Sequence, residues 1–143
     1  MPIHPALKFQ RVLLTLAGLA ISFQLATSAP AEEPEDLAGT WTWTWKDGES
    51  KVHKHVLDVE ATGGKLSARE RFDDEESIKV DDLKLKDDSV TFSVKRGTRS
   101  STYKGKMVGK KTINGLVNVV LDGQPNEFQW TAERAIETKT KPK

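Results

Sequence analysis

Three tryptophans separated by single threonines constrain the fold of this chain more than any other sequence feature. Trp41, Trp43 and Trp45 are each two residues apart. Successive side chains of a β-strand point to opposite faces, so a strand over 39–46 places the three indoles on one face. On a helix the same rings would be scattered around the axis. Three large rings on one face need a cover, and we expect all three to be buried by the rest of a sheet.

The chain after this stretch continues as short alternating segments that are separated by turn sequences such as Asp47-Gly48 and Gly63-Gly64. The expected strands are 39–46, 51–61, 65–72, 78–85, 89–96, 101–108, 112–121 and 127–136, the fourth of them interrupted by Asp81-Asp82. Short connections imply antiparallel neighbours, because parallel pairs need long crossovers. We therefore predict an all-β fold, an eight-stranded antiparallel up-and-down barrel, which removes sheet edges. A two-sheet β-sandwich is the alternative.

The N-terminal segment has the pattern of a signal peptide. Lys8 and Arg11 precede an apolar run at 12–25, and Ala29-Pro30-Ala31 supplies an A-x-A sequence. We predict a signal peptide over 1–31 and an exported protein, either periplasmic or secreted. The alternative is a membrane anchor, but the run is shorter than the ~20 residues that a comfortable span needs. We thus expect no transmembrane segment after signal removal.

The remaining chain is long enough for one core and one domain. We predict a flexible acidic leader over 32–37, a single β-barrel domain over 38–137 and a disordered polar tail over 138–143. The chain has no cysteine. Disulfides and thiolate metal sites are therefore excluded, and the domain must be stabilised by its core.

Charge is distributed unevenly along the chain. Residues 32–88 contain 17 acidic and 9 basic residues, whereas residues 89–121 contain 7 basic residues and no acid. The basic block indicates a surface for an anionic partner, for which the candidates are Lys104, Lys106, Lys110 and Lys111. The alternative is a solvated face that pairs with the acidic half. Exposed aromatics do not interleave with these basic residues as they do in single-strand binders, so we expect no nucleic acid partner.

Gly39-Thr40-Trp41 at the start of the first expected strand resembles the G-x-W opening of the lipocalin and avidin group of barrels. The segments 64–68 and 102–106 are also similar to the avidin-type layout. The resemblance implies that Gly39, Trp41 and Arg134 close one end of the barrel, with the basic residue packed over the indole. The T-D-Y motif of lipocalins is absent. The biotin-contacting residues of avidins have no counterparts here, so the resemblance implies no ligand.

Five aromatic residues are candidates for a ligand pocket inside the barrel. They are Trp41, Trp43, Trp45, Tyr103 and Trp130. The interior of a small barrel is just wide enough for side chains to fill, so core packing is the alternative explanation for all five.

His53 and His55 place two imidazoles on one face of the second strand, a spacing that zinc sites use, with Glu70 as a third ligand. The alternative is histidines that line the barrel mouth or face water, and we predict no metal and no cofactor. Glu70 falls on an apolar face, so it needs a partner there, either Arg96 or Arg134.

Catalytic sequence motifs are lacking. The chain contains no G-x-S-x-G, no H-E-x-x-H and no cysteine nucleophile. We predict a non-catalytic protein that binds a small apolar or amphipathic ligand in its interior. The alternative is an envelope or extracellular module whose outer surface contacts a protein or an anionic glycan.

Overall fold

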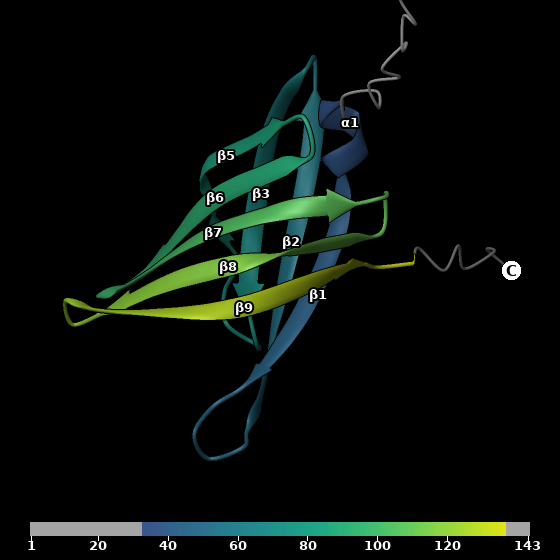
Figure 1. The fold of residues 1–143 in the computed structure, drawn as a ribbon. Helices are drawn as coiled ribbons and strands as arrows, with labels where there is room; N and C mark the ends of the chain where they lie inside the picture. Colours follow the sequence, from purple (N-terminus) through teal and green to yellow (C-terminus); the bar gives the residue numbers. More distant parts are fainter. Residues whose placement is uncertain (1–32, 137–143) are drawn as a thin grey trace, which may run out of the picture.

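The structure, a computed structural model, describes residues 33–136 as a nearly closed antiparallel β-barrel (Figure 1). One short helix, α1 (Pro34–Leu37), precedes a single nine-stranded sheet of order β4-β3-β2-β1-β9-β8-β7-β6-β5. The strands are β1 (Gly39–Lys46), β2 (Val52–Thr62), β3 (Lys65–Phe72), β4 (Ile78–Lys79), β5 (Asp81–Lys86), β6 (Ser89–Arg96), β7 (Arg99–Val108), β8 (Thr112–Leu121) and β9 (Gln124–Arg134). The predicted antiparallel barrel is confirmed, and the described strands belong to one sheet rather than to the two sheets of a sandwich.

The predicted count of eight strands is corrected, because the fourth expected strand is divided in two. β4 pairs with β3 and β5 pairs with β6, and Val80 lies between them. The N–H of Val80 donates to the carbonyl oxygen of Ala68 at 3.0 Å. Asp82 then adopts a left-handed φ of 54°, and the register shifts between Asp81 and Lys84. The bend carries the chain from one neighbour to the other and so connects the two ends of the sheet.

The junction between β1 and β9, which we call the seam, is paired along only part of its length. Trp41 pairs with Arg134 and Thr42 with Glu133, and the ladder stops there. Beyond this point the two strands separate (Figure 1). The barrel therefore has one closed end, at the start of β1, and one open mouth, at the end of β1.

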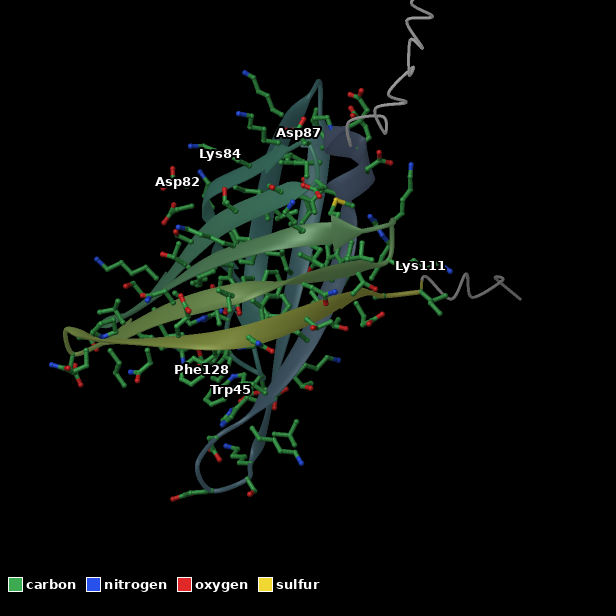
Figure 2. The ribbon with its side chains drawn as sticks, viewed as in Figure 1. Trp45, Asp82, Lys84, Asp87, Lys111 and Phe128 are labelled. Carbon is green, nitrogen blue, oxygen red and sulfur yellow. The ribbon has the colours of Figure 1, made fainter. Side chains whose placement is uncertain are left out.

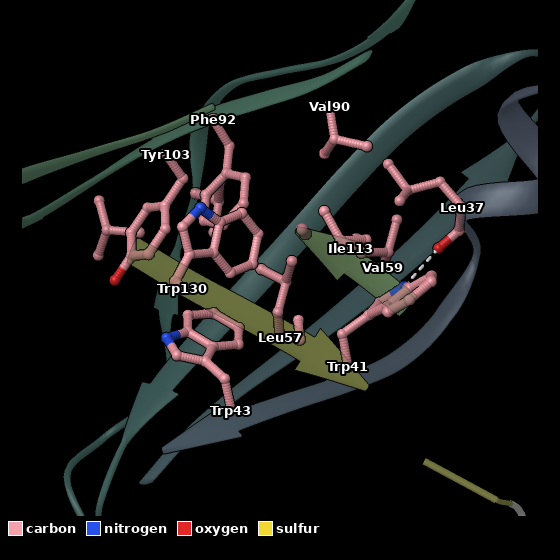
Figure 3. Close-up of a cluster of buried hydrophobic side chains, with 14 of the residues drawn as sticks. Leu37, Trp41, Trp43, Leu57, Val59, Val90, Phe92, Tyr103, Ile113 and Trp130 are labelled. Carbon is pink, nitrogen blue, oxygen red and sulfur yellow. Dashed lines mark hydrogen bonds between the residues drawn. The ribbon is translucent and has the colours of Figure 1, made fainter. Parts of the chain in front are cut away.

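The core lies along the inner face of the sheet and is rich in aromatic rings (Figure 3). Trp130 crosses a pair of glycines, Gly105 and Gly115, that face each other on β7 and β8. A Cβ on Gly105 would lie 3.1 Å from the Trp130 ring, and one on Gly115 would lie 2.5 Å from the Cα of Gly105. The glycines thus allow two strands and one indole to pack within the space that a side chain would occupy.

Part of the predicted flexible leader belongs to the packed domain. Residues Pro34–Leu37 form one helical turn, and the Leu37 side chain is fully buried. Its carbonyl oxygen accepts a 2.9 Å hydrogen bond from the indole N–H of Trp41 (Figure 3). The predicted signal peptide and tail lie outside the described residues. Within residues 33–136, no helix has the length and apolar character needed to cross a membrane.

Candidate functional site

The three tryptophans of β1 lie at three depths of the barrel. Trp41 is fully buried at the closed end, Trp43 is buried in the middle, and Trp45 is 41% exposed at the mouth. The prediction that all three indoles are buried is therefore wrong for Trp45. The reason is the partly paired seam, since β9 no longer runs beside β1 at that depth.

The residues Gly39, Trp41 and Arg134 meet at the closed end. The Cζ of Arg134 lies 4.3 Å from the centroid of the Trp41 ring, a cation–π geometry. Burial lowers the pKa of Arg134 below its ordinary value. Gly39 has a φ of 129°, and a Cβ there would lie 2.6 Å from a guanidinium nitrogen of Arg134. The backbone conformation therefore favours glycine, and the missing side chain leaves room for the guanidinium.

A pocket of about 460 Å³ opens at the mouth, between the separated parts of β1 and β9. Trp45 and Phe128, which is 54% exposed, both line it, and Figure 2 shows them at the same end of the barrel. Its inner wall includes Trp43, Tyr103 and Trp130. The volume lies within the range that small-molecule sites occupy. Of the five aromatic residues predicted for a pocket, the structure brings four to this one and leaves Trp41 at the closed end.

The inner wall of the mouth pocket, which we call its floor, is a tight aromatic cluster. The Trp43 ring centroid lies 5.3 Å from that of Trp130 and 5.4 Å from that of Tyr103. Phe92 stacks on Tyr103 at 4.5 Å. Burial raises the pKa of the Tyr103 hydroxyl well above its ordinary value, so this group stays neutral. The cluster fills the barrel below the pocket and forms an apolar floor.

A buried carboxylate lies beside this floor. Glu70 is 1% exposed, and its Oε1 lies 2.6 Å from Nδ1 of His55 while its Oε2 accepts from Arg96 at 2.7 Å. Burial alone would raise the pKa of Glu70, but hydrogen bonds from His55 and Arg96 outweigh it and lower the pKa. His55 in turn stacks on Trp43, with ring centroids 4.8 Å apart. Of the two partners predicted for Glu70, the structure contains Arg96.

His53 joins two turns at the rim of the mouth. Its Nδ1 lies 2.7 Å from Oδ2 of Asp73, and its Nε2 lies 3.1 Å from Oδ2 of Asp47. The ring is stacked between Trp45 at 4.8 Å and Phe72 at 5.2 Å. Hydrogen bonds to Asp73 and Asp47 raise the pKa of His53. We call His53, Asp47 and Asp73 the rim clip.

The two histidines of β2 are therefore engaged by different carboxylates. His53 belongs to the rim clip, and His55 belongs to the ion pair of Glu70 and Arg96. In the part of the chain that the structure describes, no three His, Asp or Glu side chains are arranged to hold a metal ion.

The structure divides the four lysines predicted for an anionic partner into two pairs. Lys104 and Lys106 project from the outer face of β7 and line a shallow groove of about 860 Å³. Lys106 also pairs with Asp88 at 3.3 Å. Lys110 and Lys111 lie in the hairpin between β7 and β8, at the closed end, where Lys110 forms an ion pair with Asp36.

Phe128 and Arg99 line the mouth pocket but are not among the pocket residues that the sequence predicts. Phe128 alternates with Trp130, and the period of two places both on the inward face of the last strand. Phe128 lies near the start of β9 and Arg134 at its other end, and this separation is the sequence signal for a position at the mouth. Arg99 was expected in a turn, whereas β7 begins at this residue. Both residues line the pocket.

Comparison of the chain with models of known protein families finds no match, and neither does comparison with curated protein sequences.

Proposed function

We propose that this protein is an exported, non-catalytic binding protein that holds a small apolar or amphipathic molecule in the mouth pocket. The observation that carries the proposal is an open pocket of about 460 Å³ with an aromatic lining. Trp45, Leu121 and Phe128 leave large apolar surfaces exposed at this one site. An apolar ligand would remove these surfaces from water, which stabilises the complex.

The seam between β1 and β9 supports this proposal because it leaves the aromatic floor accessible. A fully paired seam would bring the two strands within about 5 Å of each other along their whole length. The sequence features of export, namely the basic start, the apolar run and the A-x-A site, support a role outside the cytoplasm. The G-x-W resemblance to lipocalins and avidins supports a binding role for a barrel of this kind.

The test is a titration with N-phenyl-1-naphthylamine, a neutral apolar fluorophore. We expect saturable binding of the probe and a decrease in iodide quenching of tryptophan, because Trp45 is the most exposed of the four indoles. Trp45→Ala and Phe128→Ala should each weaken probe binding by roughly tenfold, which corresponds to the loss of much of one aromatic contact.

Val108→Ala is the matched control for these two substitutions. Val108 is 57% exposed but lies at the far end of β7, beside the closed end. Its truncation should leave probe affinity unchanged. Equal affinity in all three variants, or no saturable binding to the native protein, would refute a ligand site at the mouth.

The outer groove supports a second candidate function, contact with an anionic glycan. Lys104 and Lys106 lie along the groove between polar side chains, and most of the lining is uncharged. We expect the native protein to be retained on a sulfated dextran column, and the paired change Lys104→Glu and Lys106→Glu to remove retention. The paired change Lys79→Glu and Lys84→Glu, on exposed residues of β4 and β5, is the control.

A further inference from the structure

We infer that the mouth pocket selects an organic anion, a flat apolar body that carries one carboxylate, and that Arg99 binds the carboxylate. This inference rests on the proposed function and adds the chemical class of the ligand. Arg99 lines the pocket at the start of β7, with its Cζ 4.7 Å from the centroid of the Phe72 ring. Among the residues that the structure describes, its guanidinium has no carboxylate partner and no hydrogen bond.

Arg96 provides the comparison within the same strand pair, since it faces Arg99 in the register of β6 and β7. The guanidinium of Arg96 donates to both Glu70 and Glu75 and to two backbone carbonyl oxygens. Its hydrogen-bonding capacity is used inside the protein. Arg99 has the same five donors, and they are available to a ligand.

The carboxylates of Asp47 and Glu70 contact groups other than Arg99. Oδ1 of Asp47 accepts from the N–H groups of Glu49 and Lys51 at 2.9 Å, and Oδ2 bonds His53. Both oxygens of Glu70 are taken by His55 and Arg96.

The charged residues of the lining therefore favour an anion. They are Lys46, Asp47 and Arg99. Two cations and one carboxylate leave the lining with a net positive formal charge. A guanidinium beside aromatic walls is partly removed from water, and an anionic ligand supplies the partner that residues 33–136 do not.

The shape of the lining points to a flat body. Trp43, Trp45 and Trp130 present indole rings, and Phe128 and Tyr103 add two more rings. Planar ligands stack on such rings. The planar guanidinium of Arg99 can bind the carboxylate of the same ligand through two parallel hydrogen bonds. An aromatic carboxylate of one or two rings fits a pocket of about 460 Å³.

The test compares 2-naphthoate with 2-naphthamide, which have the same ring system but differ in charge, by isothermal titration calorimetry. We expect the native protein to bind the carboxylate roughly tenfold more tightly than the amide, from a charge-assisted hydrogen-bonded pair. Arg99→Gln should remove this preference by weakening 2-naphthoate and leaving 2-naphthamide unchanged. Arg99→Lys should retain part of it.

Lys95→Gln is the matched control, since it removes one positive charge from an exposed position of β6 and should change neither affinity. Salt provides a test that needs no variant: raising it should weaken 2-naphthoate alone. Equal affinities for both compounds in the native protein would overturn the inference while leaving the apolar site in place. If neither compound binds but N-phenyl-1-naphthylamine binds saturably, the inference is overturned and the proposed function stands. If none of the three compounds binds, the proposed function is overturned as well.

Discussion

The guanidinium of Arg134 lies over the indole of Trp41, with its Cζ 4.3 Å from the ring centroid. The same guanidinium donates hydrogen bonds to the backbone carbonyl oxygens of Asp36, Ala38 and Lys110. These carbonyls belong to α1, to its C-cap and to the hairpin between β7 and β8. One side chain of β9 thus connects three segments of the chain and covers the closed end of the barrel.

Replacement of Arg134 should therefore lower stability without changing the mouth. We expect Arg134→Ala to reduce the free energy of unfolding by roughly 2–4 kcal/mol, through loss of the hydrogen bonds and the cation–π contact. Denaturant titration measures this change. Arg71→Ala, on an exposed position of β3, is the control and should change stability by less than about 0.5 kcal/mol. A small effect at Arg134 would contradict its role in closing the barrel.

The glycine pair beneath Trp130 predicts a second stability effect. A Cβ at position 115 would collide with the carbonyl oxygen of Lys104, which is backbone and cannot rotate away. We expect Gly115→Ala to destabilise the protein by about 3 kcal/mol or more. Gly48→Ala is the control, because no atom lies within 4 Å of a Cβ there. The free energy of unfolding of Gly48→Ala should stay within about 1 kcal/mol of that of the native protein. Similar thermal midpoints for Gly115→Ala and Gly48→Ala would contradict the close packing of β7 against β8.

The buried ion pair of Glu70 and Arg96 predicts that the stability lost on replacing one partner depends on whether the other is present. Glu70→Ala leaves the charge of Arg96 without its buried partner, and we expect it to reduce the free energy of unfolding by about 3–5 kcal/mol. Glu60→Ala, an exposed acid on β2, should have little effect. The double change of Glu70 and Arg96 to alanine should cost clearly less than the sum of the single changes. Additive losses would show that the two groups act independently.

The rim clip predicts a pH dependence of stability. The raised pKa of His53 means that its contribution is complete below the ordinary value of 6.5 and is lost as pH rises through the raised value. The lowered pKa values of Asp47 and Asp73 mean that their contributions are complete above 3.8 and are lost as pH falls. The stabilisation by the clip should therefore be greatest between pH 3.8 and 6.5.

Thermal unfolding of the native protein and of His53→Gln at a series of pH values checks this prediction. The difference between the two melting temperatures should be largest in that window and should shrink on both sides. NMR titration of the His53 ring should show a midpoint above 6.5. A difference in melting temperature that is constant with pH would contradict the clip.

The sequence pattern predicted the strands accurately because alternation is a local property. The expected segments 39–46, 65–72, 89–96 and 112–121 coincide with β1, β3, β6 and β8. The same parity predicted that Glu70 points inward and needs a basic partner, and the structure shows it against Arg96. Each of these inferences depends on side chains of one strand and on the period of two.

The site was less predictable because it depends on where strands stop pairing. Trp45 follows the same alternation as Trp41 and Trp43, yet it is exposed because β9 leaves β1 after Thr42. Arg96 and Arg99 both belong to the basic block and face each other across β6 and β7. Only their tertiary contacts distinguish them, because Arg96 binds Glu70 and Arg99 lines the pocket. Neither fact is encoded in the residues next to these positions.

The sequence by itself therefore determined an antiparallel all-β domain, the positions of its strands and the inward face of each, since these follow from local geometry and short connections. Only the tertiary structure decided which tryptophan is exposed, which arginine lines the pocket and where the pocket opens. The physical reason is that the twist and closure of a sheet accumulate over all of its strands, so the gap between β1 and β9 is a property of the whole barrel.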